Sequence, residues 1–127
     1  MKLVENEPRY YEFIRRLRDD KEVKKGFIQQ EDITEKQHQK FMMKYASHYY
    51  ICIENNIPIG FVGVIDDDIR VATHPDHQAQ GVGTFMISEL IKRFPMATAK
   101  VKIENEASLR IFEKCGFKKK YYILEKE

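Results

Sequence analysis

The chain has 127 residues, of which 43% are hydrophobic and 33% charged, with a formal net charge of +2. This length suits one domain, residues 1–127, with one hydrophobic core. The near balance of acids and bases argues against a nucleic-acid partner, which usually requires a strong basic excess. No apolar run approaches the ~20 residues that cross a bilayer, and the N-terminus lacks the apolar stretch of a signal peptide. We therefore expect no membrane association and a cytoplasmic location.

Hydrophobic spacing predicts helices and strands in alternation. Thr34 and Gln37 have the form of a capping box that opens a helix. Pro95 and Gly116 have the usual character of helix-terminating positions. In chain order we expect a strand at 3–4, helices at 8–17 and 34–45, strands at 48–54, 58–65 and 69–73, a helix at 83–93, a strand at 97–103, a helix at 106–115 and a strand at 117–124. This order predicts an α/β or α+β domain whose mixed central sheet of about six strands is flanked by about four helices.

The two cysteines and four histidines give weak signals. Two cysteines do not make a disulfide framework, and Cys52 lies in an apolar strand where packing is its expected role. His74 and His77 flank a proline with no further ligand cluster, so we expect no metal site. His38 is expected on the surface of the helix at 34–45.

A glycine turn joins the strand at 69–73 to the helix at 83–93. Gly81 and Gly83 stand at this junction, where backbone N–H groups at a helix N-terminus favour a phosphate. Glycines alone indicate only a tight turn. No Gly-Lys-Ser or Gly-Lys-Thr is present, which excludes a Walker loop, and no third glycine follows, which excludes the dinucleotide fingerprint.

Two motifs together resemble a known family. Gln78, Gly81 and Gly83 match the pattern Arg/Gln-x-x-Gly-x-Gly/Ala, with Pro75 upstream. The second motif, at residues 105–117, matches Asn-x-x-Ser/Ala followed by an aromatic residue and Gly-Phe. In this order and at this distance, the two motifs resemble the GNAT superfamily of N-acetyltransferases, over most of residues 48–123. Within that family, the N-terminal sequence and residues 112–117 loosely resemble the branch that acetylates amino groups on nucleotide-linked sugars.

The resemblance implies acetyl-CoA as cofactor and a site for it. The glycine turn would receive the pyrophosphate, the strand at 69–73 would contact the pantetheine and acetyl end, and the second motif would hold the pantetheine arm. Asn105 would also serve as an N-cap for its helix, with Ser108 on the first turn. The implied cofactor-binding residues are Val71, Ala72, Thr73, Gln78, Ala79, Gln80, Gly81, Val82, Gly83, Thr84, Asn105, Ser108 and Phe112.

The catalytic acid and base are poorly marked. Many family members carry a tyrosine acid where this chain has Phe112, so thiolate protonation would fall to water or to Tyr121 or Tyr122. Positions that hold a glutamate base in some relatives carry Asp67 and Lys100 here. Asp67 is better explained as part of a polar turn, and Lys100 as an exposed strand residue or as a contact to an anionic group of the substrate. A chain of waters could carry the proton instead.

The resemblance leaves the acceptor open. A primary amine of a small molecule such as an amino sugar is the first expectation. A protein N-terminus or lysine is the alternative, as is a degenerate domain that only senses acetyl-CoA. The chain would act as a monomer or a homodimer.

Overall fold

The computed structural model describes residues 1–28 and 32–127. Within these residues four strands form one antiparallel sheet in the order β1-β2-β3-β4. The strands are β1 (Lys2–Glu5), β2 (Tyr49–Glu54), β3 (Ile57–Ile65) and β4 (Asp68–Thr73). The helices are α1 (Tyr11–Asp19), α2 (Lys21–Lys24), α3 (Glu35–Tyr45), α4 (Val82–Arg93) and α5 (Glu106–Lys114), with short 3-10 turns at η1 (Pro8–Tyr10), η2 (Ala46–His48) and η3 (Pro75–His77).

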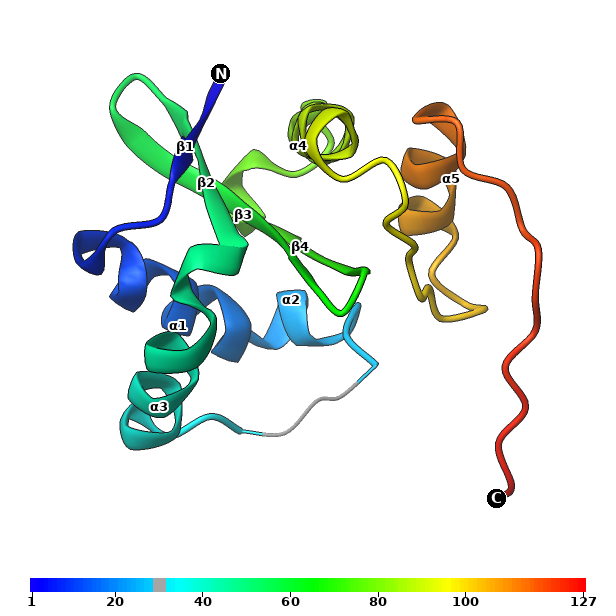
Figure 1. The fold of residues 1–127 in the computed structure, drawn as a ribbon, viewed down its shortest axis with the longest axis horizontal. Coiled ribbons are helices and arrows are strands. Elements are labelled where there is room, and N and C mark those ends of the chain that lie inside the picture. The colour runs from blue at the N-terminus through cyan, green and yellow to red at the C-terminus, as the bar shows by residue number, and fades with distance from the viewer. Residues whose placement is uncertain (29–31) are drawn as a thin grey trace.

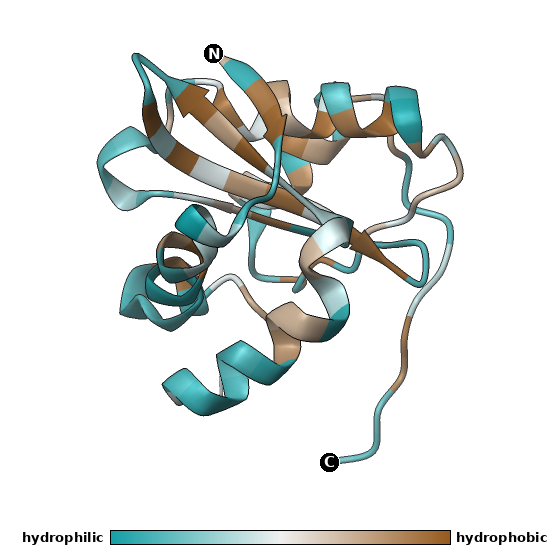
Figure 2. Ribbon diagram, turned by 60° about the vertical axis from the view of Figure 1, so that its left-hand side comes forward, coloured by the Kyte–Doolittle hydropathy of each residue, from teal (hydrophilic) through white to brown (hydrophobic). Residues whose placement is uncertain are grey.

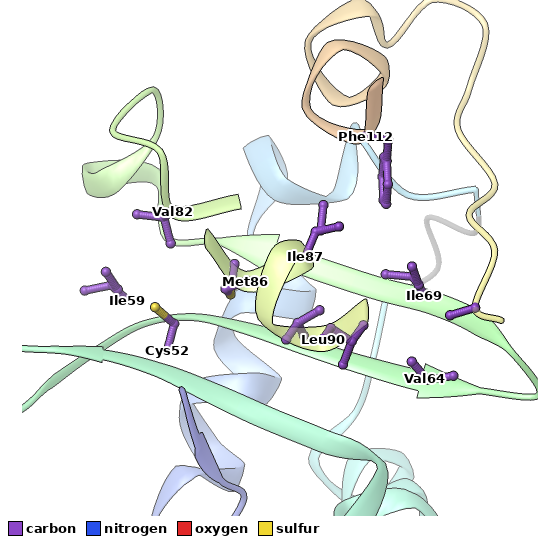
Figure 3. Close-up of a cluster of buried hydrophobic side chains, with 11 residues drawn as sticks. Cys52, Ile59, Val64, Ile69, Val82, Met86, Ile87, Leu90 and Phe112 are labelled. Carbon is purple, nitrogen blue, oxygen red and sulfur yellow. The ribbon is translucent and has the colours of Figure 1, made fainter. Parts of the chain in front are cut away.

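The sheet separates two hydrophobic clusters. Helices α1 and α3 lie on one face, and α4 and α5 lie on the other (Figure 1). Side chains alternate along β4, because Ile69 and Val71 pack with α4 and α5 while Ala72 packs with α1 and α3. The α4–α5 cluster includes Met86, Ile87 and Leu90 of α4 against the sheet (Figure 3). The apolar strands are thus enclosed between polar outer helix faces (Figure 2).

Local signals in the sequence located most helices. Thr34 Oγ1 accepts from the Gln37 N–H at 3.1 Å, and the Gln37 side chain accepts from the Thr34 N–H at 3.0 Å. This reciprocal capping box begins α3 as predicted. After α1 the chain forms the short helix α2, because Asp20 Oδ1 accepts from the N–H groups of Glu22 and Val23 and caps a single helical turn.

The prediction of a mixed six-stranded sheet was wrong. Residues 97–103 form only one parallel bridge, between Asp68 and Thr98, and residues 117–124 form no strand. The last segment runs beside the domain with Tyr121 and Leu124 at least 90% exposed (Figure 1). Both segments have strand-like composition, but a strand also needs a neighbouring edge with which to pair. That edge depends on where the chain runs after Thr98, which local composition does not report.

No helix among the described residues is long and apolar enough to cross a membrane.

Candidate active site

The turn between β4 and α4 has the geometry of an anion cradle. Gly81 has φ +81° and Ala79 has φ +62°, so the turn uses two left-handed residues just before α4 begins at Val82. The Phe85 N–H donates to the Gly81 carbonyl at 3.0 Å, which makes it the first helical hydrogen bond. The N–H groups of residues 82–84 therefore precede the helical ladder and have no helical acceptor. Such groups, at the positive end of α4, suit a phosphate.

The space in front of this turn is open. A Cβ built on Gly81 would meet no atom within 4 Å. Gln78, Ala79 and Gln80 are exposed, while Val82 is buried in the core beneath the turn. Gly83 and Thr84 lie between these extremes. The turn thus presents backbone to solvent and is anchored by one apolar side chain.

Among the described residues no strand pairs with the outer edge of β4 beyond its first residues, although Gln78 Nε2 donates to the Thr73 carbonyl at 3.5 Å. The Ile69 N–H donates to Thr98 O at 2.9 Å, and the Thr98 N–H donates to Asp67 O at 2.7 Å. Beyond this bridge the two segments have no further described pairing. Backbone groups alternate along a strand, so those of Val71 and Thr73 point to the same open edge as those of Ile69. Ala72 is paired with Phe61 of β3 and its backbone points inward.

The second motif builds the start of α5. Asn105 Oδ1 accepts from the Ser108 N–H at 3.1 Å and caps the helix. The Asn105 side chain also approaches α2, since a Cβ built on Gly26 would lie 3.3 Å from its Nδ2. Phe112 is buried against the sheet, with its ring 5.2 Å from that of Phe117 (Figure 3). The aromatic position of the motif therefore packs the core in this chain.

Both candidate bases lie near the contact between Asp67 and Thr98, one in the β3–β4 turn and the other two residues beyond Thr98. Asp67 has φ +62° in the β3–β4 turn, where its carbonyl holds Thr98. It stands at the opposite end of β4 from the glycine turn, a separation of about 20 Å at ~3.3 Å per residue. Lys100 is exposed in the segment beyond Thr98. Tyr121 and Tyr122, the alternative acids, lie in the exposed C-terminal segment.

A polar cluster that the sequence did not predict lies on the opposite face of β4. His38 is only 3% exposed, so its expected surface position was wrong. Its Nε2 lies 2.7 Å from the Tyr11 carbonyl, which can only accept a hydrogen bond, so Nε2 carries the proton. Its Nδ1 then accepts from Arg18 Nη1 at 3.2 Å. Burial lowers the pKa of His38, and the imidazole is neutral.

Arg18 and its neighbours complete this cluster. The Arg18 guanidinium lies 4.0 Å above the Phe41 ring, and burial lowers its pKa. Tyr49 is buried beside it, and burial raises the pKa of the phenol. Arg70 of β4 pairs with Asp68 at 3.0 Å. The sequence signal that could have found the cluster is the alternation along β4, which directs Asp68 and Arg70 away from the α4–α5 core.

Neither of the loop histidines is arranged as a metal ligand. His74 Nδ1 accepts from the Asp76 N–H at 3.1 Å and so caps η3, and its ring centroid lies 6.0 Å from that of His77. In residues 1–28 and 32–127 no group of three potential His, Cys, Asp or Glu ligands occurs.

Residues 10–117 match the model of the acetyltransferase (GNAT) family. The chain belongs to that family. It is accordingly an acetyl-CoA-dependent N-acetyltransferase, and acetyl-CoA is its cofactor. The match includes both the glycine turn and the Asn105–Phe117 motif. No curated protein matches the sequence.

Solved structures share the fold of this GNAT acetyltransferase at low sequence identity. Spermidine N-acetyltransferase from Vibrio cholerae, in complex with CoA and spermine, is 17% identical with a TM-score of 0.84 and coverage of 98% of this chain and 85% of its own. The Salmonella typhimurium protein yncA, with its cofactor acetyl-CoA, is 17% identical, with a TM-score of 0.76 and coverage of 92% and 79%. Ribosomal-protein-alanine N-acetyltransferase from Brucella melitensis is 10% identical, with a TM-score of 0.78 and coverage of 93% and 85%.

Proposed function

We propose that this enzyme transfers the acetyl group of acetyl-CoA to a primary amine of a small molecule that carries negative charge, such as a nucleotide-linked amino sugar. The observation that carries the proposal is the positive charge on the acceptor side of the cofactor site. The fold alone does not choose an acceptor, because neighbours with the same fold are named for a polyamine and for a ribosomal protein.

The glycine turn and the open edge of β4 support one position for the cofactor. The N–H groups of residues 82–84 would bind the pyrophosphate, and the exposed backbone from Gln78 to Gly81 would line its approach. The backbone of Val71 and Thr73 would pair with the amides of the pantetheine arm, which would run along the open edge towards Asn105. The thioester would then lie between β4 and the segment beyond Thr98.

The acceptor side of this gap carries cationic side chains. Ala99 and Val101 pack against the α4–α5 core, whereas Lys100 between them is exposed. Lys102 Nζ donates to the Lys25 carbonyl at 3.1 Å. Arg70 points away from the α4–α5 core, because it alternates with Ile69 and Val71 along β4. Among the described residues no carboxylate lies within ion-pair distance of either lysine.

The positive charge on the acceptor side would also favour acetyl transfer itself. A positive potential lowers the pKa of an incoming ammonium group, so more of the acceptor arrives as free amine. The amine nitrogen attacks the thioester carbonyl, and collapse of the tetrahedral intermediate breaks the carbon–sulfur bond and expels the CoA thiolate. The nitrogen loses its proton to water, and the cations stabilise the developing thiolate. The mechanism thus proceeds without a dedicated acid at Phe112 or a carboxylate at Asp67.

Free-thiol release from acetyl-CoA, followed with a panel of amines, tests the proposal. We expect a nucleotide-linked amino sugar to have kcat/KM about tenfold or more above that of spermidine, because like charges repel at the lysine-lined gap. The double variant Lys100→Gln with Lys102→Gln should lose this preference.

The pair Lys118→Gln with Lys120→Gln is the matched control, since it removes the same charge at the same spacing from an exposed segment. Preference for spermidine, or for a peptide N-terminus, would overturn the proposed acceptor class. CoA binding without release on any amine would assign the chain a sensing role instead.

A further inference from the structure

The Arg18 guanidinium is a partly buried cation that forms an ion pair with no carboxylate of residues 1–28 and 32–127. Its contacts are the Phe41 ring, at 4.0 Å, and His38 Nδ1, at 3.2 Å. In the described part of the chain Arg18 forms no ion pair, whereas Arg15 and Arg16 of the same helix both pair with Glu12. Removing a charge from water is unfavourable unless a counter-ion or hydrogen bonds replace the solvent. Arg18 therefore has a place for a counter-ion, and a negatively charged ligand could supply it.

The surrounding groups do not supply the missing negative charge. His38 is neutral, because its Nε2–H donates to the Tyr11 carbonyl while its Nδ1 accepts from Arg18. Asp19, next in the sequence, pairs with Lys24 at 2.9 Å. Tyr49 is buried beside Arg18 as a neutral phenol.

Arg70 adds a second guanidinium near that of Arg18. Its Nε pairs with Asp68 Oδ2 at 3.0 Å, and Asp68 Oδ1 is buried without a hydrogen-bond partner. Arg70 is close enough to Arg18 to contribute to lowering the Arg18 pKa. The two arginines and the single carboxylate sum to one positive charge, so the cluster as a whole is not neutralised.

The cluster lies at the gap where the acceptor would enter. Arg70 follows the Asp68–Thr98 bridge by two residues, at the point where the outer edge of β4 opens. Its neighbours Ile69 and Val71 pack with α4 and α5, so alternation along β4 places the Arg70 side chain on the other face of the sheet. Val71, which contributes its backbone to the open edge, is the adjacent residue. A group held by Arg18 and Arg70 would thus lie close to the thioester.

We propose that Arg18, together with Arg70, binds a phosphate group of the acceptor and so selects phosphorylated amines. The inference rests on the proposed acetyl transfer to an anionic small molecule and names the residues that recognise its charge. A planar guanidinium offers two parallel N–H donors that match phosphate oxygens. Phe41 fixes the plane of the Arg18 guanidinium, and His38 uses one of its donors, which leaves the others for the ligand.

A matched pair of acceptors separates phosphate recognition from catalysis. Acetylation of glucosamine 6-phosphate and of glucosamine is measured at saturating acetyl-CoA in the wild type, Arg18→Gln, Arg70→Gln and Arg16→Gln. We expect Arg18→Gln and Arg70→Gln to raise KM for the phosphorylated amine about tenfold or more relative to KM for glucosamine. Arg16→Gln removes the same charge from the exposed side of α1 and should change neither.

A binding measurement keeps the site testable if neither amine is a substrate. Inorganic phosphate is titrated into the CoA-saturated protein, so that the glycine turn is already filled, and the shift in melting temperature is followed. Phosphate should stabilise the wild type and Arg16→Gln but not Arg18→Gln. An equal shift in Arg18→Gln would overturn the site, whatever the acceptor proves to be.

The stability of the variant in the absence of phosphate provides a second check. A residue retained for structure loses stability when replaced, whereas replacing an uncompensated cation by a neutral side chain that can still donate to His38 does not. We expect the melting temperature of ligand-free Arg18→Gln to equal or exceed that of the wild type. A lower melting temperature together with an unchanged KM for glucosamine 6-phosphate would make Arg18 a structural residue only.

Discussion

Gly81→Asp should separate CoA binding from folding. The residue has φ +81°, a conformation that aspartate and asparagine tolerate better than other side chains do, and its added Cβ would meet nothing within 4 Å. The backbone strain should therefore be about 1 kcal/mol or less. A carboxylate at this position would face the site proposed for the CoA pyrophosphate.

The size of the binding defect follows from Coulomb's law. Two like charges 4–7 Å apart, at an effective dielectric constant of about 20, repel by roughly 2–4 kcal/mol. This corresponds to a loss in CoA affinity of roughly 30- to 1,000-fold at low ionic strength. Because Gly81 is exposed, added salt should shrink the defect.

Gly81→Asn is the matched control, since it has the same shape and the same backbone tolerance but no charge. Titration calorimetry of CoA at low and high salt, with urea unfolding of each variant, measures both quantities. We expect similar stability for the two variants and much weaker CoA binding by Gly81→Asp alone. Equal CoA affinity in Gly81→Asp and Gly81→Asn would refute the position assigned to the pyrophosphate.

Three further predictions concern the core. Gly60→Ala should lower the free energy of unfolding by about 1–3 kcal/mol in urea denaturation, because the new Cβ would lie 2.8 Å from the Ala72 carbonyl of the adjacent strand. Burial lowers the pKa of His38, so as the pH falls the unfolded chain binds a proton at this histidine before the folded protein does. The free energy of unfolding should therefore decline below pH ~6.5, by at most about 1.4 kcal/mol per pH unit from this group. His38→Gln should remove that part of the slope in pH-dependent denaturation. Burial raises the pKa of Cys52 to about 11, so iodoacetamide at pH 8 should label Cys115 in the native protein and Cys52 only after unfolding, as mass spectrometry would record.

Motifs with short-range causes were predictable from the sequence. The capping box at Thr34 involves residues three apart, and the helix that it begins ends at Tyr45 as expected. Asn105 caps α5 through the Ser108 N–H, for the same local reason. The left-handed turn at Gly81 is likewise encoded where it occurs, because glycine adopts positive φ without a steric penalty.

Long-range placement was not predictable. Residues 97–103 have the composition of a strand but leave β4 after one bridge at Thr98, because pairing requires an available edge as well as propensity. Which of Val71 and Ala72 presents its backbone to the opening depends on the register with β3, and no local pattern reports that register. The local sequence predicts a surface position for His38, but the packing of α1 against α3 buries it.

The sequence by itself indicated the family, and it marked the glycine turn and the Asn105 cap on which the proposed cofactor site rests. Glycine turns and helix caps depend on residues only a few positions apart, so the spacing of these residues in the sequence predicts them. Only the tertiary structure brought Arg18 of α1, His38 of α3 and Arg70 of β4 together. It also buried Arg18 in part without an ion-pair partner among the described residues. The interaction energy of a charge depends on the groups and the dielectric constant around it. For Arg18 those groups come from three segments far apart in the chain.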